Sequence, residues 1–226
     1  MEQVLLRYIP NVVDNRLELV ESVGETIIMV SISGIISLIL GTVIGVLLVV
    51  TKEGNILEND TINGIIGKVI NFFRSIPFII LIGALIPLTR LIVGSAIGTR
   101  GAIVPLIFGT VPFFSRQIET ALLEVDRGVI EAAQAMGSGP LDIVFRVYLR
   151  EGLPGIVRGI TLTLISLIGL SAMAGAIGGG GLGDFAIRYG YQRFQMDITY
   201  VTIVIILIFV SIIQGVGNFI LKRIEH

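Results

Sequence analysis

Three stretches of the chain contain no charged residue and are long enough to cross a lipid bilayer. They are residues 26–50, 159–183 and 198–221. Since about 20 predominantly apolar residues span the hydrocarbon core as a helix, each stretch predicts a membrane-spanning helix. Residues 116–158 separate the first two stretches from one another and are rich in Asp, Glu and Arg. The central part of that segment cannot lie in lipid, so we expect a polar loop between spans.

Two shorter apolar runs, residues 75–89 and 101–115, lie between arginines. At about 1.5 Å rise per residue each falls short of a full span unless flanking residues join it. Extending the first backward past a snorkelling Arg74 and the second forward to Leu123 completes them. The pattern then predicts five spans, at about residues 24–50, 66–89, 101–122, 156–178 and 198–221. The alternative makes the short pair a re-entrant hairpin, and either count places the two termini on opposite sides.

Composition agrees with an all-α polytopic membrane helix bundle, which we expect to form a single transmembrane domain over residues 1–226. Hydrophobic residues make up 54% of the chain and charged residues 15%. A net charge of −1 gives no basic field for nucleic acid, and a lone His226 with no cysteine argues against a metal site or a thiol nucleophile. Charges throughout residues 1–24 are unlike a signal peptide, so the first span is expected to direct its own insertion.

Basic residues near the span ends predict the orientation, because they favour the cytoplasmic side. With the C-terminus inside, ten of the 16 lysines and arginines lie on the inner side and six on the outer side. The inner ones are Lys52, Lys68, Arg74, Arg116, Arg127, Arg146, Arg150, Arg158, Lys222 and Arg223, and the outer ones are Arg7, Arg16, Arg90, Arg100, Arg188 and Arg193. We therefore expect the loop at about residues 123–155 to face the cytoplasm and the N-terminus to lie outside.

Within this loop, residues 128–148 can form an amphipathic helix. One side would carry Ile130, Ala133, Gly137, Leu141, Val144 and Tyr148. Gly137–Pro140 should bend or break the helix. Its small residues let another backbone approach closely, which suits docking into a groove on a partner protein. The alternative is a helix that rests on lipid headgroups, although its apolar side lacks Trp and is interrupted by Gly and Ala.

The loop resembles the EAA signature of the membrane subunits of bacterial ABC importers. Glu131-Ala-Ala is followed after three residues by Gly137 and after nine more by Val147-Tyr-Leu149. Val147 stands for the usual Ile, whereas Arg150 replaces the expected Pro. In that family the loop forms a short coupling helix seated in the ATPase subunit. The resemblance implies an ATPase contact through Glu131, Ala132, Ala133, Gly137, Leu141 and Leu149.

A second stretch is similar to the methionine importer permeases. It runs from Ser171 through the glycines at 178–181 to Asp184, and continues from Arg188 to Phe194; Arg74-Ser-Ile-Pro-Phe78 also fits. The resemblance implies a homodimer in the bacterial cytoplasmic membrane that moves methionine by alternating access. It also implies two ATPase subunits, which bind ATP and Mg²⁺, and an extracytoplasmic methionine-binding protein. No cofactor is expected in this chain.

The glycines at 178–181 lack the strand and the basic residue of a phosphate-binding loop, so we expect them to end a helix and allow a turn. The fourth span carries small or weakly polar residues at Ser166, Gly169, Met173 and Ala176. That face is a candidate translocation pathway, with Met173 as a flexible gate, or a close helix contact at a subunit interface. Beyond it, Asp184, Arg188 and Arg193 are candidate contacts for the binding protein, or solvated loop charges.

Three other functions remain as alternatives. An ABC permease for another amino acid or a quaternary amine would share the same coupling loop. An ion-coupled secondary carrier would need acidic residues inside the spans, and the core of each span has no Asp or Glu. An intramembrane hydrolase would need catalytic groups that this composition lacks. Dependence of uptake on ATP therefore distinguishes an ABC permease from the ion-coupled carrier and from the hydrolase.

Overall fold

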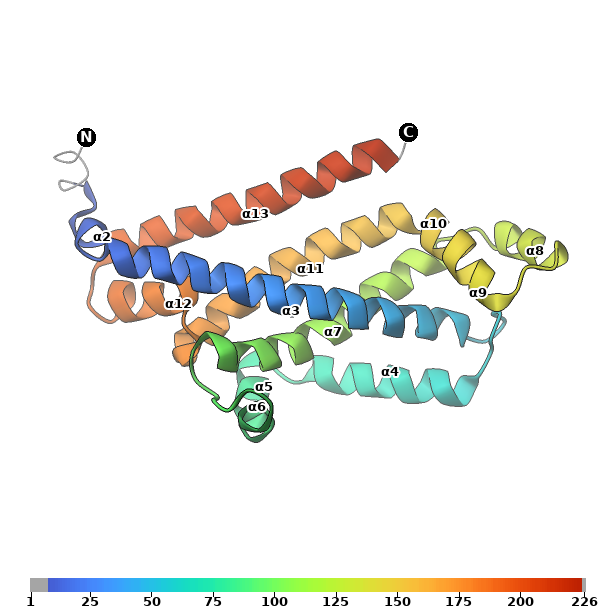
Figure 1. Cartoon of the computed structure of the whole chain (residues 1–226), viewed down its shortest axis with the longest axis horizontal. Helices are drawn as coiled ribbons and strands as arrows, with labels where there is room; N and C mark the ends of the chain where they lie inside the picture. The colour runs from blue at the N-terminus through green and yellow to red at the C-terminus, as the bar shows by residue number, and fades with distance from the viewer. Residues whose placement is uncertain (1–7, 225–226) are drawn as a thin grey trace. The chain divides into compact units, whose positions relative to one another are not determined.

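The computed structural model describes residues 8–224, and this part of the chain is built from helices with no strand (Figure 1). Four helices are individually long and apolar enough to cross a membrane. They are α3 (Arg16–Val50), α7 (Gly98–Leu123), α11 (Leu153–Ala174) and α13 (Met196–Ile224). The expected all-α membrane fold is confirmed, and α3 begins two turns before the predicted span. Arg7, His226 and the two chain ends lie outside the described residues.

The second expected span is not a single helix over residues 66–89. The chain forms α4 (Asp60–Ser75), α5 (Phe78–Ala84) and α6 (Ile86–Val93), with a break between α4 and α5. Pro77 causes this break, because it has no N–H and disfavours a helical residue before it; Ile76 is extended, with φ −88° and ψ 122°. The structure thus has four spanning helices, or five if the bent pair counts as one span. The hairpin alternative is wrong for the third segment, since α7 is a continuous helix of 26 residues.

Short helical elements fill the connections between the long helices. They are α2 (Pro10–Asp14), α8 (Arg127–Ala135), α9 (Pro140–Ile143), η1 (Val144–Tyr148), α10 (Leu149–Glu151), η2 (Gly175–Gly179), α12 (Gly181–Phe185) and η3 (Ala186–Tyr191), where η marks a π-helical turn. The elements from α8 to α10 follow one another in the connection between α7 and α11 (Figure 1). This connection is the predicted coupling loop.

The described chain divides into two compact units. The first unit contains Pro77–Phe108, Leu164–Ile213 and the described residues up to Ile35. Its cores are two clusters of buried side chains, Met29, Ala102, Leu106, Leu167 and Ala174 in one and Val12, Phe185, Tyr189 and Ile198 in the other. Helix α2 is tied to the start of α13, because Asn11 donates through its backbone and its side chain to the Asp197 carboxylate, each at 2.9 Å.

The second unit contains Ile36–Ile76, Gly109–Thr163 and the described residues from Gln214. Its core joins α3 and α7, and Phe114 and Ile118 are fully buried there. Gly45 lets these helices approach closely, because a Cβ at this position would lie 2.5 Å from the Ile118 Cβ.

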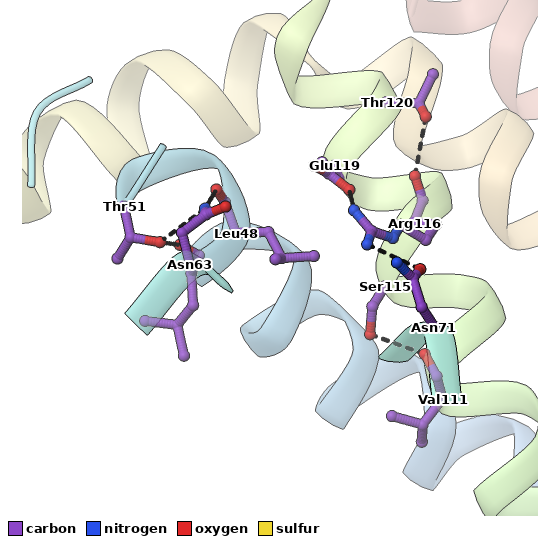
Figure 2. Close-up of polar contacts among 10 residues, drawn as sticks. Leu48, Thr51, Asn63, Asn71, Val111, Ser115, Arg116, Glu119 and Thr120 are labelled. Carbon is purple, nitrogen blue, oxygen red and sulfur yellow. Dashed lines mark hydrogen bonds and ion pairs between the residues drawn. The ribbon is translucent and has the colours of Figure 1, made fainter. Parts of the chain in front are cut away.

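Polar side chains fix α4 against both neighbours in this second unit (Figure 2). The Asn63 amide donates to the Leu48 carbonyl at 2.6 Å and to the Thr51 hydroxyl at 3.1 Å. The first bond gives the Leu48 carbonyl, in the last turn of α3, a hydrogen-bond partner. Further along α4, Asn71 accepts a 3.1 Å hydrogen bond from Arg116, which also pairs with Glu119 at 2.5 Å (Figure 2). The charge of Arg116 is therefore paired and hydrogen-bonded where its side chain is only 25% exposed.

The inner and outer sets of basic residues that were defined by the expected orientation fall in different units. All ten residues of the expected inner set fall in the second unit. The described members of the outer set, from Arg16 to Arg193, fall in the first unit. This division does not test whether residues 1–226 form a single transmembrane domain, which stays a prediction.

Candidate functional site

The polar loop forms two helices separated by a sharp turn. Helix α8 starts at an N-cap where Asp126 accepts a 2.7 Å hydrogen bond from the Gly128 N–H. It ends in a Schellman motif: the Gly137 N–H donates to Gln134 and the Ser138 N–H to Ala133, while Gly137 has φ +82°. The predicted break at Gly137–Pro140 is confirmed. Gly137 therefore has the conformational role that the sequence predicted, and its left-handed backbone ends α8.

One face of this segment packs on the core of its own unit. Ala133, Ile143, Val144 and Tyr148 are buried there, and Ile130 packs against them. Leu141 was expected on this face, but its side chain is 73% exposed. The reason is the break at Gly137, which changes the helical phase and turns Ile143 inward in its place. Of the face predicted over residues 128–148, Ile130, Ala133, Val144 and Tyr148 pack inward as expected, and the prediction is wrong for Leu141.

The opposite face presents apolar side chains to the outside. Met136, Leu141 and Phe145 are 79%, 73% and 66% exposed, and we call these residues the exposed apolar patch. Glu131 and Ala132 are also exposed. Sequence reasoning missed Met136 and Phe145, and the phase change at Gly137 is the only local signal that points to them. Single exposed apolar residues are common, but three large ones close together in the sequence of a polar loop indicate a contact surface.

Two of the predicted coupling residues face inward instead. Ala133 is 4% exposed in the buried core, and Leu149 packs against that core. Ala133 is covered by its own unit and Leu149 is partly covered, and both help to seat the segment, on which Glu131, Ala132 and Leu141 are exposed. The role of these residues as ATPase contacts stays a prediction.

Tyr148 connects this segment to the connection between α3 and α4. Its hydroxyl donates a 2.6 Å hydrogen bond to the Asn55 side chain, and the residue is 2% exposed. Burial raises the pKa of the Tyr148 phenol above its ordinary value of 10.0, while the Asn55 hydrogen bond and Arg127 act in the opposite direction. The hydroxyl therefore stays protonated at physiological pH. The bond also puts the connections after α3 and after α7 at the same end of the unit.

The candidate pathway residues form one exposed stripe along the fourth span. Ser166, Gly169, Met173 and Ala176 are all exposed in the single chain, and nothing lies within 4 Å of a Cβ built on Gly169. At Gly169 the stripe therefore packs against no other helix of the described chain, and its other residues are exposed. Both expectations for it, a pathway and a subunit contact, involve something outside this chain.

The glycines after this stripe reverse the chain, as expected. Helix α12 returns against the end of α11, and a Cβ on Gly183 would clash with the Ala172 backbone. Gly179, Gly181 and Gly183 are buried, so packing within the same chain leaves no room for a larger side chain at these positions. The turn is a structural hairpin, which we call the glycine hairpin (residues 175–185).

The candidate docking residues are held by local contacts. Arg188 forms a 2.8 Å ion pair with Asp184, and the guanidinium groups of Arg188 and Arg193 lie 4.8 and 4.3 Å from the centre of the Tyr189 ring. Phe194 follows with φ +57° and is 88% exposed. A bulky residue in this left-handed region is uncommon and costs on the order of 1–3 kcal/mol. Phe194 was not singled out from the sequence.

These spans and this exposed loop belong to a membrane transport component. Residues 41–226 match the model of the family described as "Binding-protein-dependent transport system inner membrane component". Because the match covers most of the chain, the chain belongs to this family, whose members are inner-membrane proteins. The ABC-permease class read from the EAA signature is thereby confirmed.

The chain is 49% identical over 208 residues to the probable D-methionine transport system permease protein MetI of Vibrio cholerae, covering 92% of each chain. It is 47% identical over 179 residues to the methionine import system permease protein MetP of Bacillus subtilis, covering 79% of this chain and 81% of the relative. The resemblance to methionine importer permeases is confirmed.

Solved structures agree. A chain of the MetNI methionine ABC transporter in an inward-facing conformation superposes with a TM-score of 0.91 at 44% identity, covering 93% of this chain and 98% of that one. An amino acid ABC transporter is matched with a TM-score of 0.77 at 16% identity, which shows a shared fold alone.

Proposed function

We propose that this chain is the permease subunit of an ATP-driven methionine importer, working as a homodimer. Two ATPase subunits and an extracytoplasmic methionine-binding protein complete the transporter. The observation that carries the proposal is the apolar patch of Met136, Leu141 and Phe145 on the EAA loop of a family member. The names of the relatives, D-methionine permease and methionine import permease, supply the substrate.

The coupling loop transmits movement because it is rigid on one face and exposed on the other. Ala133, Val144 and Tyr148 anchor it in the unit's core, and the Tyr148–Asn55 hydrogen bond adds a directional constraint. A patch attached in this way moves with the ends of α3 and α7 and not as a free loop. ATP-driven closure of the ATPases would then draw two such loops together and open the bundle to the other side by alternating access.

The stripe from Ser166 to Ala176 lines the pathway between the two copies. Its residues are exposed in the single chain and small or flexible, which leaves room for an amino acid. Met173, at 41% exposure, acts as the gate because a thioether side chain changes rotamer readily. ATP and Mg²⁺ are bound by the ATPase subunits and not by this chain.

In the proposed orientation the second unit's loops face the cytoplasm and the N-terminus lies outside. The excess of lysine and arginine in the second unit, ten of 16, supports this orientation. The Tyr148–Asn55 contact brings the ends of the first and third spans together, as a five-span arrangement requires in either orientation. Asp184, Arg188 and Arg193 consequently face the delivery protein.

Substrate identity is tested by uptake of radiolabelled L-methionine into proteoliposomes that contain the chain, its ATPase and its binding protein. Unlabelled D- and L-methionine should compete in excess, whereas leucine and glycine betaine should not. If another amino acid or a quaternary amine competes and methionine does not, that solute is the substrate and the methionine assignment is wrong.

The coupling surface is tested by a charge in the exposed apolar patch. Phe145→Asp should abolish co-purification of the ATPase, because a desolvated unpaired carboxylate at an interface costs about 2 to 5 kcal/mol. Phe194→Asp is the matched control, since Phe194 is equally apolar and even more exposed but lies in the first unit. Equal loss of ATPase from both variants, or from neither, removes the patch as the coupling surface.

A further inference from the structure

The carboxylate of Glu25 reaches from α3 to two segments far away in the chain. Its Oε2 atom accepts a 2.6 Å hydrogen bond from the Gly181 N–H, 156 residues later. Its Oε1 atom accepts a 3.0 Å hydrogen bond from the Thr99 hydroxyl at the start of α7. All three residues belong to the first unit. Both carboxylate oxygens thus have a partner, and one side chain joins three elements.

Thr26 extends the same attachment by one residue. Its buried hydroxyl accepts a 2.8 Å hydrogen bond from the Leu182 N–H and donates to the Ser22 carbonyl at 3.0 Å. Gly181 and Leu182 open helix α12, whose first N–H groups have no partner within the helix. Side chains of α3 therefore cap α12 from outside it, in place of the usual local cap.

The backbone of the hairpin is shaped for this contact. Gly181 has φ +74°, and a Cβ there would lie 2.7 Å from the Thr26 hydroxyl. A Cβ on Gly180 would lie 2.7 Å from the Glu25 carboxylate. A larger residue at either position would push α3 and the hairpin apart. The amides that a phosphate-binding loop would offer to an anion are occupied here by the chain's own acid and hydroxyl.

The anchored hairpin in turn fixes the end of the fourth span. Helix α12 packs on η2 and α11 without space for side chains, since a Cβ on Gly175 would lie 2.6 Å from the Asp184 N and 2.9 Å from the Gly183 Cα. Met173 and Ala176 lie at this end of α11 and η2. A displacement of Gly181 therefore displaces the part of the stripe that carries the proposed gate.

We infer that Glu25 is a positioning residue for translocation: through Gly181 it holds the glycine hairpin against α3 and thereby sets the position of Met173. Both Glu25 carboxylate oxygens are engaged by partners within the chain. The hydrogen-bonding part of this inference stands on contacts within the chain, and its transport part rests on the proposed function.

Hydrogen exchange of the peptide that covers residues 178–185, measured on the full chain in complex with its ATPase, tests the anchor directly. Glu25→Ala removes both acceptors and should speed exchange of the Gly181 and Leu182 amides by about tenfold or more. Glu25→Gln keeps one carbonyl acceptor and should give a smaller increase. Glu21→Ala, one turn earlier and exposed on the same helix, is the control and should match the wild type.

Uptake by the same complexes tests positioning. In Glu25→Ala the maximal rate of methionine uptake should fall at least about fivefold while the KM for the loaded binding protein changes less, with partial rescue in Glu25→Gln. If Glu25→Ala does not assemble, Glu25→Gln, which weakens the acceptor of the Gly181 N–H and keeps the side-chain volume, decides on the same readouts. Exchange equal to that of Glu21→Ala overturns the anchor whatever the uptake. Faster exchange with wild-type uptake overturns the positioning role, whereas a wild-type complex that takes up no methionine refutes the proposed function and leaves the anchor standing.

Discussion

Tyr148 and Asn55, 93 positions apart, are joined by a 2.6 Å hydrogen bond between the phenol and the side-chain amide oxygen. Asn55 also accepts a 2.8 Å hydrogen bond from the Ile56 N–H, so its oxygen stays paired if the phenol is removed. Removal of the phenol therefore breaks this attachment of the coupling loop to the end of α3 without leaving the Asn55 oxygen unpaired. This attachment is the physical link between the exposed patch and the spans.

Tyr148→Phe should lower the free energy of unfolding by about 0.5 to 1.5 kcal/mol, because it removes one buried hydrogen bond and retains the ring. ATP hydrolysis should then be less tightly matched to uptake. A double-mutant cycle with Asn55→Ala, read by thermal unfolding in detergent, should give a coupling energy of similar size. Additive single effects would mean that the bond stabilises nothing.

The pH dependence of this contribution follows from the raised pKa of Tyr148. The folded state holds the phenol proton more tightly than the unfolded state, so the contribution is fully present below the ordinary pKa of 10.0. It is lost as pH rises from there through the folded pKa. The stability difference between wild type and Tyr148→Phe should therefore be constant from about pH 6 to pH 9. A change within that range contradicts the assignment.

Gly137 offers an isosteric pair of substitutions that separates backbone strain from charge. Its φ of +82° is tolerated by both Asn and Asp, and no atom lies within 4 Å of a Cβ there. Gly137→Asn should keep ATPase binding and most transport. Gly137→Asp should lose about 2 to 4 kcal/mol of association through an unpaired charge at the contact, while insertion survives. Similar ATPase recovery from both variants would remove the loop from the interface.

The absence of cysteine from the sequence makes single-cysteine labelling a direct test of orientation. Gln192→Cys, exposed after η3, should react with a membrane-impermeant maleimide in intact cells. Glu124→Cys, exposed before α8, should react only after permeabilisation. Reversed labelling would invert the orientation and place the coupling loop away from any cytoplasmic ATPase.

Gly169 and Gly45 form a matched pair for the pathway. A Leu at Gly169 enters open space, so the single chain should fold normally, whereas at Gly45 it meets Ile118 and should cost about 1 to 3 kcal/mol or more. Gly169→Leu should therefore block uptake in an assembled complex that still hydrolyses ATP. Gly45→Leu should lower the yield. Dissociation of the Gly169→Leu dimer would favour a packing role for the stripe, and wild-type uptake would exclude both roles.

The long helices were predictable because their signal is local: an uncharged run of sufficient length. The break at Gly137 was predictable as well, since Gly and Pro act on their own backbone. The break in the second span was not predicted, because the length and hydropathy of the run take no account of the proline at position 77. Leu141 was misplaced for a related reason, since a single helical phase was carried across a turn that resets it.

Glu25 shows what a single sequence cannot reveal. An acidic residue at the edge of an apolar run is typical of a membrane interface, and nothing near it indicates Gly181 as its partner. The glycines at 178–181 were correctly predicted to form a turn, but not what holds that turn. Contacts between residues this far apart in sequence become visible only when the helices are packed.

The central claim is that ATP drives methionine through this chain. Its most direct measurement is the initial rate of methionine uptake into proteoliposomes that hold the complete complex, with ATP, with a non-hydrolysable analogue, or with a proton or sodium gradient alone. We predict uptake against a gradient with ATP and none with the analogue or with either ion gradient. Uptake energised by an ion gradient without ATP would contradict the account.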